Sequence, residues 1–237
     1  MKISVCMATF NGASYLNEQI KSILPQLHPE DEFLVSDDGS TDGTLEILSV
    51  YSHTIKLVSS SKVGGIVPNF NRVITAATGD IIVFSDQDDV WLGGRLNMIR
   101  YEMQFSDLIL MNAHVVDHQL MYSNKTLFKI LGVRIGFCSN LVKNSFVGCC
   151  MAIRSDVLKS ALPLPSYIPM HDWYLGMICE VFYRVKRVEQ PYLLYRRHIF
   201  SASQTANTSS YSYFRRLSMR IALLFAFFMY SLRIFRT

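Results

Sequence analysis

The sequence has few charged residues and none of the short motifs that most often mark a phosphate or metal site. Charged residues make up 18% of the 237 residues and hydrophobic residues 50%, so an intrinsically disordered chain is excluded. The motifs G-x-x-x-x-G-K-[ST] and G-x-G-x-x-G are both absent, which excludes a P-loop and a glycine-rich dinucleotide site. The acids also lack the spacing of an EF-hand.

Cysteine pairs with metal-ligand spacing are missing as well. None of the five cysteines belongs to a C-x-x-C pair, and most lie within apolar runs. We therefore expect buried free thiols in a reducing compartment, at Cys6, Cys138, Cys149, Cys150 and Cys179.

An obvious membrane span and a signal peptide are also lacking. The apolar core of the C-terminal segment, residues 221–232, is 12 residues long, whereas a helix needs about 20 apolar residues to cross a bilayer. The N-terminal apolar run stops at Asn11 and is too short for a signal peptide, so we expect a cytoplasmic protein.

Acidic residues are scarce in the second half of the chain. Residues 1–119 hold 7 basic and 15 acidic residues, residues 120–237 hold 16 and 4, and no acid follows Glu189. In the tail, arginines bracket the apolar core, which favours a helix lying on the inner face of the plasma membrane; a core helix or an oligomer contact is the alternative. No nucleic-acid partner is expected, because these charges adjoin apolar sequence rather than an aromatic-interleaved groove.

What the sequence does contain is an alternation of apolar runs rich in Ile and Val with segments of helical periodicity. The runs near residues 2–10, 32–37, 55–60, 80–86, 107–117 and 145–155 are continuously apolar, which is typical of strands buried on both faces. The fold class predicted is α/β with a largely parallel sheet. Residues 120–145 have weak periodicity and are expected to form an insertion within the domain.

Two acidic clusters follow predicted strands. Asp37 and Asp38 end the run "EFLV", and Asp86, Asp88 and Asp89 end the run "DIIVF". If every strand of the sheet points the same way, both clusters reach one crevice, where a divalent cation most simply relieves their repulsion. Mg²⁺ and Mn²⁺ prefer oxygen ligands and commonly hold phosphates. For the stretch "DDGSTDGT", a turn followed by a helix cap is an equally good interpretation.

Four stretches together carry a family resemblance. "SVCMATFNGASYL", "LVSDDGSTDGT", "NRVITAATGDIIVFSDQDD" and "SFVGCCMAIRS…HDWYLG…YRRH" resemble, in order and spacing, family 2 glycosyltransferases of the GT-A fold, over residues 2–200. The forms "SDQDDVW" and "HDWYLG" are most similar to the bacterial rhamnosyltransferase-like branch that builds O-antigen or capsule. The resemblance implies a GT-A domain over residues 1–205, with a nucleotide-sugar half (1–119) and an acceptor half (120–205). Residues 206–237 would then be a linker and a membrane-associating helix.

The resemblance also implies roles for residues in the first half. Thr9 and Asn11 would line the nucleotide base site, and Asp38 would hydrogen-bond the base. Asp86 and Asp88 match the acids of the family's DxD motif. Asp88 would be the principal metal ligand, and Asp86 would face the ribose or sugar and the metal.

In the second half, the resemblance implies the catalytic groups. Asp172 matches the general base, and His198 stands where a histidine can reach the metal or the diphosphate. From the residues rather than the resemblance, we expect Trp173 and Tyr174 to stack on the acceptor and Arg95, in the first half, to steady the metal loop at the donor site. From the residues alone, a helix cap, a solvated turn, core packing and a solvated helix face remain the respective alternatives.

The expected activity is inverting transfer of a sugar to a lipid-linked glycan, with Mn²⁺ or Mg²⁺ as cofactor. The first candidate for the donor is dTDP-rhamnose, followed by UDP-glucose or UDP-galactose, and the acceptor expected is an undecaprenyl diphosphate glycan. The absence of Q-x-x-R-W argues against a processive synthase. A nucleotidylyltransferase is disfavoured, because "ATFNGASYL" lacks basic residues and repeated glycine. A non-catalytic nucleotide-sugar sensor or assembly subunit remains open.

Overall fold

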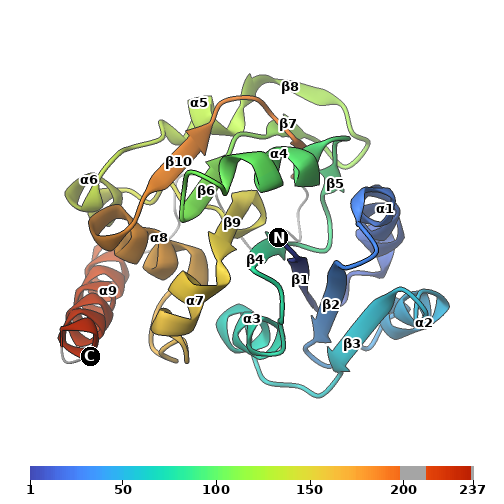
Figure 1. Cartoon of the computed structure of the whole chain (residues 1–237), viewed down its shortest axis with the longest axis horizontal. Coiled ribbons are helices and arrows are strands. Elements are labelled where there is room, and N and C mark those ends of the chain that lie inside the picture. The colour runs from blue at the N-terminus through green and yellow to red at the C-terminus, as the bar shows by residue number, and fades with distance from the viewer. Residues whose placement is uncertain (198–211, 236–237) are drawn as a thin grey trace.

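The computed structural model describes residues 1–197 and 212–235 and shows a central sheet flanked by helices (Figure 1). Seven strands lie in the order β10-β6-β9-β4-β1-β2-β3. The α/β class and the largely parallel sheet are confirmed. The strands are β1 (Ile3–Thr9), β2 (Glu32–Asp37), β3 (Ile55–Ser59), β4 (Ile81–Ser85), β6 (Leu108–Met111), β9 (Met151–Arg154) and β10 (Val185–Val188).

A smaller sheet and the helices complete the described residues. The second sheet has the order β5-β11-β7-β8, formed by β5 (Val90–Trp91), β11 (Leu193–Arg196), β7 (His114–Val116) and β8 (Tyr122–Thr126). The α-helices are α1 (Ala13–Ile23), α2 (Thr44–Val50), α3 (Ile66–Thr75), α4 (Arg95–Glu102), α5 (Leu127–Leu131), α6 (Phe137–Val142), α7 (Ser155–Ala161), α8 (His171–Phe182) and α9 (Tyr213–Ile234). Two 3₁₀ turns are η1 (Leu24–Gln26) and η2 (Gly148–Cys150).

The expectation that every strand points the same way is wrong for β9. This strand pairs antiparallel with both β4 and β6. The chain enters β9 through η2, which lies at the edge where β4 ends, so the strand must run back across the sheet. Because of this reversal, residues from the second half of the sequence begin their strand beside the acids of the first half.

The predicted apolar run at residues 107–117 divides between the two sheets. Its first part is β6 and its second part is β7, with Asn112 between them. The buried Asn112 side chain accepts hydrogen bonds from the N–H groups of Ala113 and Phe128 and donates to the carbonyl of Glu189. These bonds satisfy the backbone where the chain leaves one sheet for the other. The expected insertion, residues 120–145, contributes β8, α5 and α6.

The core explains both the continuous apolar runs and the state of the cysteines. All residues of β4 are buried, and all but one of β1, since the sheet is covered on both faces. Four cysteines are buried free thiols as predicted. The prediction is wrong for Cys138, which is exposed on α6 because that short helix turns Asn140 rather than Cys138 into the protein.

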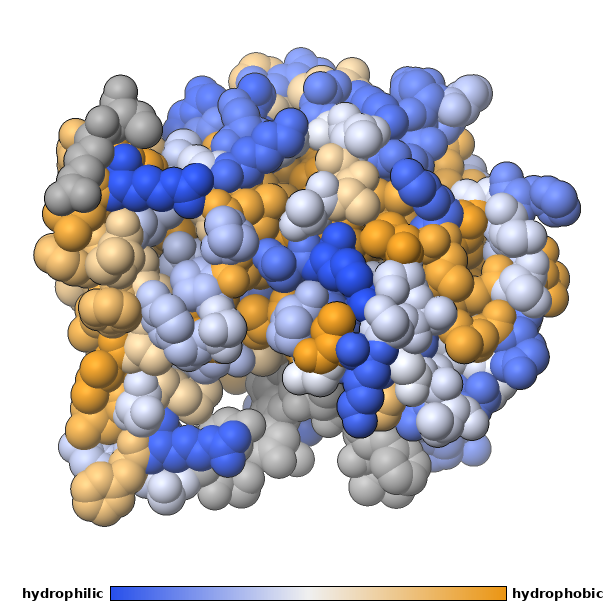
Figure 2. All heavy atoms as spheres, turned by 90° about the horizontal axis from the view of Figure 1, so that it is seen from below, coloured by the Kyte–Doolittle hydropathy of each residue, from blue (hydrophilic) through white to orange (hydrophobic). Residues whose placement is uncertain are grey.

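Helix α9 packs on α8 with one stripe and leaves much of its apolar surface exposed. Its buried residues are Leu223, Ala226 and Tyr230, and the Tyr230 hydroxyl lies 2.8 Å from the Ser160 hydroxyl of α7. The opposite face exposes large apolar side chains, among them Ile221, Leu224, Phe225, Phe228 and Leu232. Figure 2 shows apolar side chains running along this edge of the molecule. Among the described residues, α9 is long and apolar enough to cross a membrane by length and composition.

Candidate active site

The carboxyl ends of three neighbouring parallel strands form one polar edge. Strand β1 lies between β4 and β2, with Thr9 paired to Asp37 and Met7 paired to Ser85. The residues that follow β2 and β4, Asp38 and Asp86, therefore lie on either side of β1 at the same edge. Adjacent strands are about 4.8 Å apart, so the two acidic clusters face one region, as predicted.

The carboxylates at the end of β2 organise the surrounding loops. The hydroxyl of Thr9, which is buried, donates to Asp37 at 2.8 Å. Asp38 accepts the N–H groups of Gly64 and Gly65, at 2.8 and 2.7 Å, and that of Val63. Partial burial alone would raise the pKa of Asp38, but these three donors outweigh it and lower the pKa. Asp38 thus stays ionised and holds the loop before α3.

Asn11 fixes the loop after β1 against the loop after β2. Its backbone adopts a left-handed conformation, with φ of 48°, which Asn tolerates better than most residues. Its N–H donates to the Ser40 hydroxyl at 2.8 Å, and its side-chain oxygen accepts the Thr41 N–H at 2.9 Å. The neighbouring Phe10 ring is exposed at this edge. Of the three residues expected at the base site, Thr9 and Asp38 are buried, and Asn11 is exposed.

Gln87, for which no role was predicted, joins the loop after β4 (residues 86–89, called the acidic loop below) to the loop after β1. Its amide oxygen accepts the Phe10 N–H at 2.9 Å, and its amide nitrogen donates to the Phe10 carbonyl at 3.0 Å. A Cβ on Gly12 would lie 2.3 Å from the Gln87 oxygen, so glycine leaves the space this clamp needs. The sequence does show a glutamine between two acids. Its hydrogen-bond partner, Phe10, lies 77 residues away, so no local pattern links the two.

Three side chains converge beyond β4. Ligand atoms of Asp86, Asp89 and Cys149 all lie within 4.8 Å of one another. Asp89 is buried, and its Oδ2 has no hydrogen-bond partner among the described residues. Burial, then the charges of Asp88 and Asp172, raise the pKa of Asp86 to about 7, and burial with the charges of Asp88 and Asp86 raises that of Asp89. Such crowding of carboxylates fits a divalent cation.

Two of the predicted ligands are not part of this group of three. Asp88 is half-buried and influences both neighbouring carboxylates through its charge. His198 lies outside the described residues. Cys149 was expected only as a buried thiol, because its distance of 60 residues from Asp89 gives no local spacing to recognise.

Arg95 lies beneath the acidic loop rather than open to a donor. It is fully buried, its guanidinium is 4.4 Å from the centre of the Trp91 ring, and it donates to the Cys149 carbonyl. Arg196, which the sequence did not single out, holds the loop from β11. Its N–H donates to Asp89 at 3.0 Å, and its Nε donates to the Asp88 carbonyl at 2.8 Å.

Asp172 lies in the first turn of α8, close enough for its charge to raise the pKa of Asp86. Its carboxylate accepts the N–H groups of Gly148 at 3.0 Å and Trp173 at 2.6 Å. Burial outweighs these bonds and raises the pKa of Asp172 to about 6. A carboxyl group with this pKa can be ionised at neutral pH and still accept a proton.

The aromatic residues after Asp172 are packed inside. Trp173 is buried and donates its ring N–H to the Asn140 carbonyl at 3.0 Å, and Tyr174 is also buried. Both support α8 rather than presenting a face to an acceptor. His171 is buried against Phe70, with ring centres 4.1 Å apart, and burial lowers its pKa to about 3, so it is neutral.

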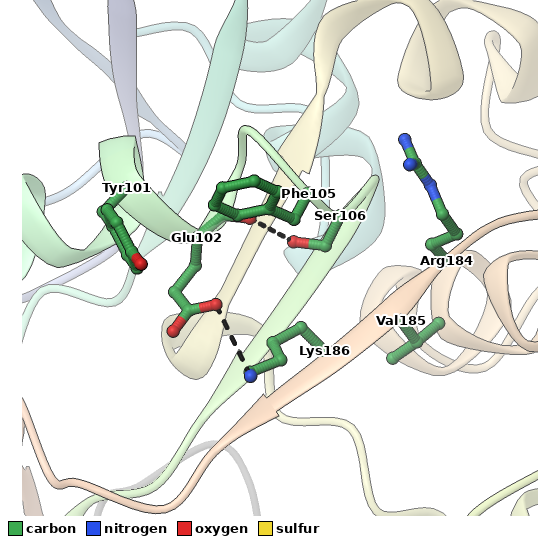
Figure 3. A pocket seen from close by; sticks show the side chains of 7 residues that line it. All are labelled: Tyr101, Glu102, Phe105, Ser106, Arg184, Val185 and Lys186. Carbon is green, nitrogen blue, oxygen red and sulfur yellow. Dashed lines mark hydrogen bonds and ion pairs between the residues drawn. The ribbon is translucent and has the colours of Figure 1, made fainter.

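A separate hollow of about 360 Å³ lies at the opposite edge of the sheet (Figure 3). It is lined by the end of α4 and the start of β10, and Lys186 pairs with Glu102 across it at 3.6 Å. In parallel sheets, ligands bind at the carboxyl ends of the strands. The hollow is at the other end of β6 and β10, so we assign no donor to it.

Comparisons with known proteins identify the family of the chain. The family described as Glycosyl transferase family 2 matches residues 4–162. The chain is 27% identical over 178 residues to WfgD of Escherichia coli, a UDP-Glc:alpha-D-GlcNAc-diphosphoundecaprenol beta-1,3-glucosyltransferase, covering 74% of this chain and 68% of WfgD. It is 29% identical over 232 residues to the dTDP-rhamnosyl transferase RfbG of Shigella flexneri, covering 90% of this chain and 78% of RfbG.

Solved structures show the same fold. Staphylococcus aureus TarS in complex with UDP-GlcNAc superposes with a TM-score of 0.69 at 20% identity, over 94% of this chain and 66% of that one. The mannosyltransferase PcManGT of Pyrobaculum calidifontis, in complex with GDP-Man and Mn²⁺, gives 0.61 at 20% identity, over 98% and 64%. The chain thus spans less than two thirds of these structures. With the family match over most of the chain and the GT-A fold in common, the protein belongs to glycosyl transferase family 2 and is a glycosyltransferase.

Proposed function

We propose that this enzyme transfers a sugar, with inversion, from a nucleoside diphosphate sugar to a lipid-linked glycan. The observation that carries the proposal is the position of Asp172 on α8: its carboxylate accepts the N–H of Gly148 at 3.0 Å, and the next residue, Cys149, lies within 4.8 Å of Asp86 and Asp89. A proton acceptor and a cation centre at the same edge of the sheet are the two elements that such a transfer needs. Residues 1–119 would supply most of the donor side and residues 120–205 the acceptor side.

The cation is proposed to bind at the acidic loop. Asp86 and Asp89 offer converging oxygens, Asp89 has an oxygen with no donor among the described residues, and Asp88 adds a third charge. This donor set fits Mn²⁺ or Mg²⁺. When bound, the cation would neutralise the charge of the leaving diphosphate as a Lewis acid. Two arginines support this site: Arg95 donates to the Cys149 carbonyl, and Arg196 of β11 donates its N–H to Asp89.

Asp172 is proposed to take the proton of the acceptor hydroxyl. In the transfer, a bond forms between the hydroxyl oxygen and the anomeric carbon, and the bond from that carbon to the diphosphate oxygen breaks. The proton passes to the Asp172 carboxylate, whose orientation is fixed by the Gly148 N–H. One such displacement inverts the anomeric centre and needs no covalent enzyme intermediate.

The donor is proposed to lie across the loops after β1, β2 and β4. The exposed Phe10 ring and Asn11 would meet the base, with Asp38 shaping the loop beside it. dTDP-rhamnose is our first candidate, supported by the similarity to RfbG, and UDP-glucose is the second, supported by the similarity to WfgD. An undecaprenyl diphosphate glycan is the acceptor we propose, as the WfgD name indicates for that enzyme.

The outer face of α9 is proposed to rest on the inner surface of an anionic membrane, where such an acceptor would be held. The face is apolar, the first turns of α9 expose Arg215 and Arg216, and the chain has no acid beyond Glu189. The inner face of α9 packs on α8, and Arg220 and Arg233 donate to the carbonyls of Leu141 and Leu162. A helix crossing the bilayer would have to abandon these contacts, so we favour a position in the plane of the surface.

A donor screen tests the activity. Purified protein is incubated with dTDP-rhamnose, UDP-glucose and UDP-galactose and a lipid-linked acceptor, with Mn²⁺, Mg²⁺ or a chelator, and the released nucleotide is measured. We expect acceptor-dependent release with one donor, lost with the chelator and lost in Asp86→Asn. Binding of a nucleotide sugar without turnover of any donor would instead support a non-catalytic assembly subunit.

A further inference from the structure

The thiol of Cys149 lies beside two carboxylates of the acidic loop, those of Asp86 and Asp89. The Sγ of Cys149 lies within 4.8 Å of carboxylate oxygens of both Asp86 and Asp89, and the cysteine is fully buried. A cysteine that only fills space can lie anywhere in the core. This one lies at the carboxyl edge of the sheet, because η2 brings it there before β9 turns back.

An oxygen with no partner points to a ligand in this group. Asp89 is 1% exposed, its Oδ1 accepts the Arg196 N–H, and the Cys149 side chain is the group that hydrogen-bonds the Asp86 and Asp89 carboxylates, while Asp89 Oδ2 has no well-aligned donor among the described residues. Leaving a buried carboxylate oxygen without a donor is costly. A cation between Asp86, Asp89 and Cys149 would satisfy it.

The backbone around Cys149 is held on both sides. The N–H of Gly148 donates to Asp172, and the carbonyl of Cys149 accepts from the buried guanidinium of Arg95. The N–H of Cys150 donates to the Val147 carbonyl at 2.9 Å. Support of this kind is what fixes a metal ligand in place.

The geometry points to Cys149 as a third protein ligand of the cation centre, beside Asp86 and Asp89. The inference rests on the proposed cation site and adds its selectivity. Sulfur is a poor ligand for Mg²⁺ but a good one for Zn²⁺ and Cd²⁺. The centre should therefore favour Mn²⁺ over Mg²⁺ and bind Zn²⁺ or Cd²⁺ more tightly than either. On binding of Zn²⁺ or Cd²⁺, the thiol proton passes to the buffer and a metal–sulfur bond forms, with no change of oxidation state.

Cadmium reports a sulfur ligand directly, through the ultraviolet charge-transfer absorbance of a cadmium–thiolate bond. The titration uses the full chain without donor, in a Cys138→Ser background, because Cys138 is the exposed thiol. We expect one equivalent of Cd²⁺ to produce the band. Cys149→Ser in that background should remove it and weaken Cd²⁺ binding at least 10-fold, whereas the matched change at the buried Cys179 should leave it intact. A band that survives Cys149→Ser, or that is lost equally with Cys179→Ser, overturns the assignment.

A second variant decides the matter if Cys149→Ser does not fold. Asp86→Asn keeps the thiol, so Cd²⁺ binding should weaken at least 10-fold while the band per bound ion persists. Unchanged Cd²⁺ affinity in Asp86→Asn overturns the assignment as well. Nucleotide release with Mn²⁺ is measured in parallel on the Cys138→Ser protein. If no donor is turned over while the cadmium band follows Cys149, the proposed function fails and the ligand assignment stands.

Discussion

The carboxyl edge of the sheet and the outer face of α9 depart from ordinary packing in opposite ways. At the edge, Asp89 and Asp172 bury carboxylates that water would otherwise solvate. On α9, Phe225 and Phe228 expose apolar rings that the core would otherwise cover. Neither arrangement favours the stability of the domain by itself. The first region is therefore suited to chemistry on a charged substrate, and the second to contact with an apolar phase.

The largest effect is expected from removing the charge at the edge. Asp172→Asn should lower the rate of transfer by about 10²–10⁴-fold, since the amide cannot accept the proton. Steady-state kinetics with the donor found in the screen measure this. Asp156→Asn is the matched control, because Asp156 lies in the first turn of α7 just as Asp172 does in α8. Equal losses in both variants would contradict the role of Asp172.

The next effect is expected on the apolar face. The paired change Leu224→Glu and Phe228→Glu should lower affinity for vesicles of anionic lipid at least 10-fold, since burying each side chain contributes roughly 1.5–3 kcal/mol. Vesicle sedimentation measures it. Phe105→Glu is the control, because Phe105 is exposed at the hollow on the other edge. Binding unaffected by the pair would show that α9 covers a protein partner or another copy of the chain.

A smaller effect is expected from the clamp between the two loops. Gln87→Ala removes both hydrogen bonds to the Phe10 backbone. Because each is worth roughly 0.5–1.5 kcal/mol, the Kd for the donor's nucleoside diphosphate should rise about 10-fold. Calorimetry measures this, with Gln104→Ala, an exposed glutamine at the far edge, as control. An unchanged Kd would show that the base site does not depend on the clamp.

A separate effect concerns the dependence of stability on pH. Burial raises the folded-state pKa of Asp172 to about 6, above that of an unfolded aspartate. Its contribution to stability is therefore full at low pH and is lost as the pH rises through about 6. Relative to wild type, Asp172→Asn should gain on the order of 2 kcal/mol in unfolding free energy between pH 4 and pH 8. Denaturant unfolding at both pH values measures the difference, and a gap independent of pH would contradict it.

The position of a site residue was predicted correctly where that residue directly follows a strand. Asp38 and Asp86 were placed correctly at one edge, because parallel strands end together. Trp173, Tyr174 and Arg95 were expected near substrates, and the structure buries all three. All three lie in the first turn of their helix, α8 or α4, where a side chain can face either way, and the sequence carries no signal for which face is covered.

Local periodicity and composition were enough to predict the α/β class, the buried strands β1 to β4, the acidic loop and the apolar, arginine-flanked tail. The tertiary structure alone decided that β9 runs antiparallel, that Cys149 meets Asp86 and Asp89, and that Gln87 clamps Phe10. It also decided that α9 docks on α8 through one stripe and exposes the other. These contacts join residues far apart in the chain, and their energy depends on packing that exists only once the sheet has formed.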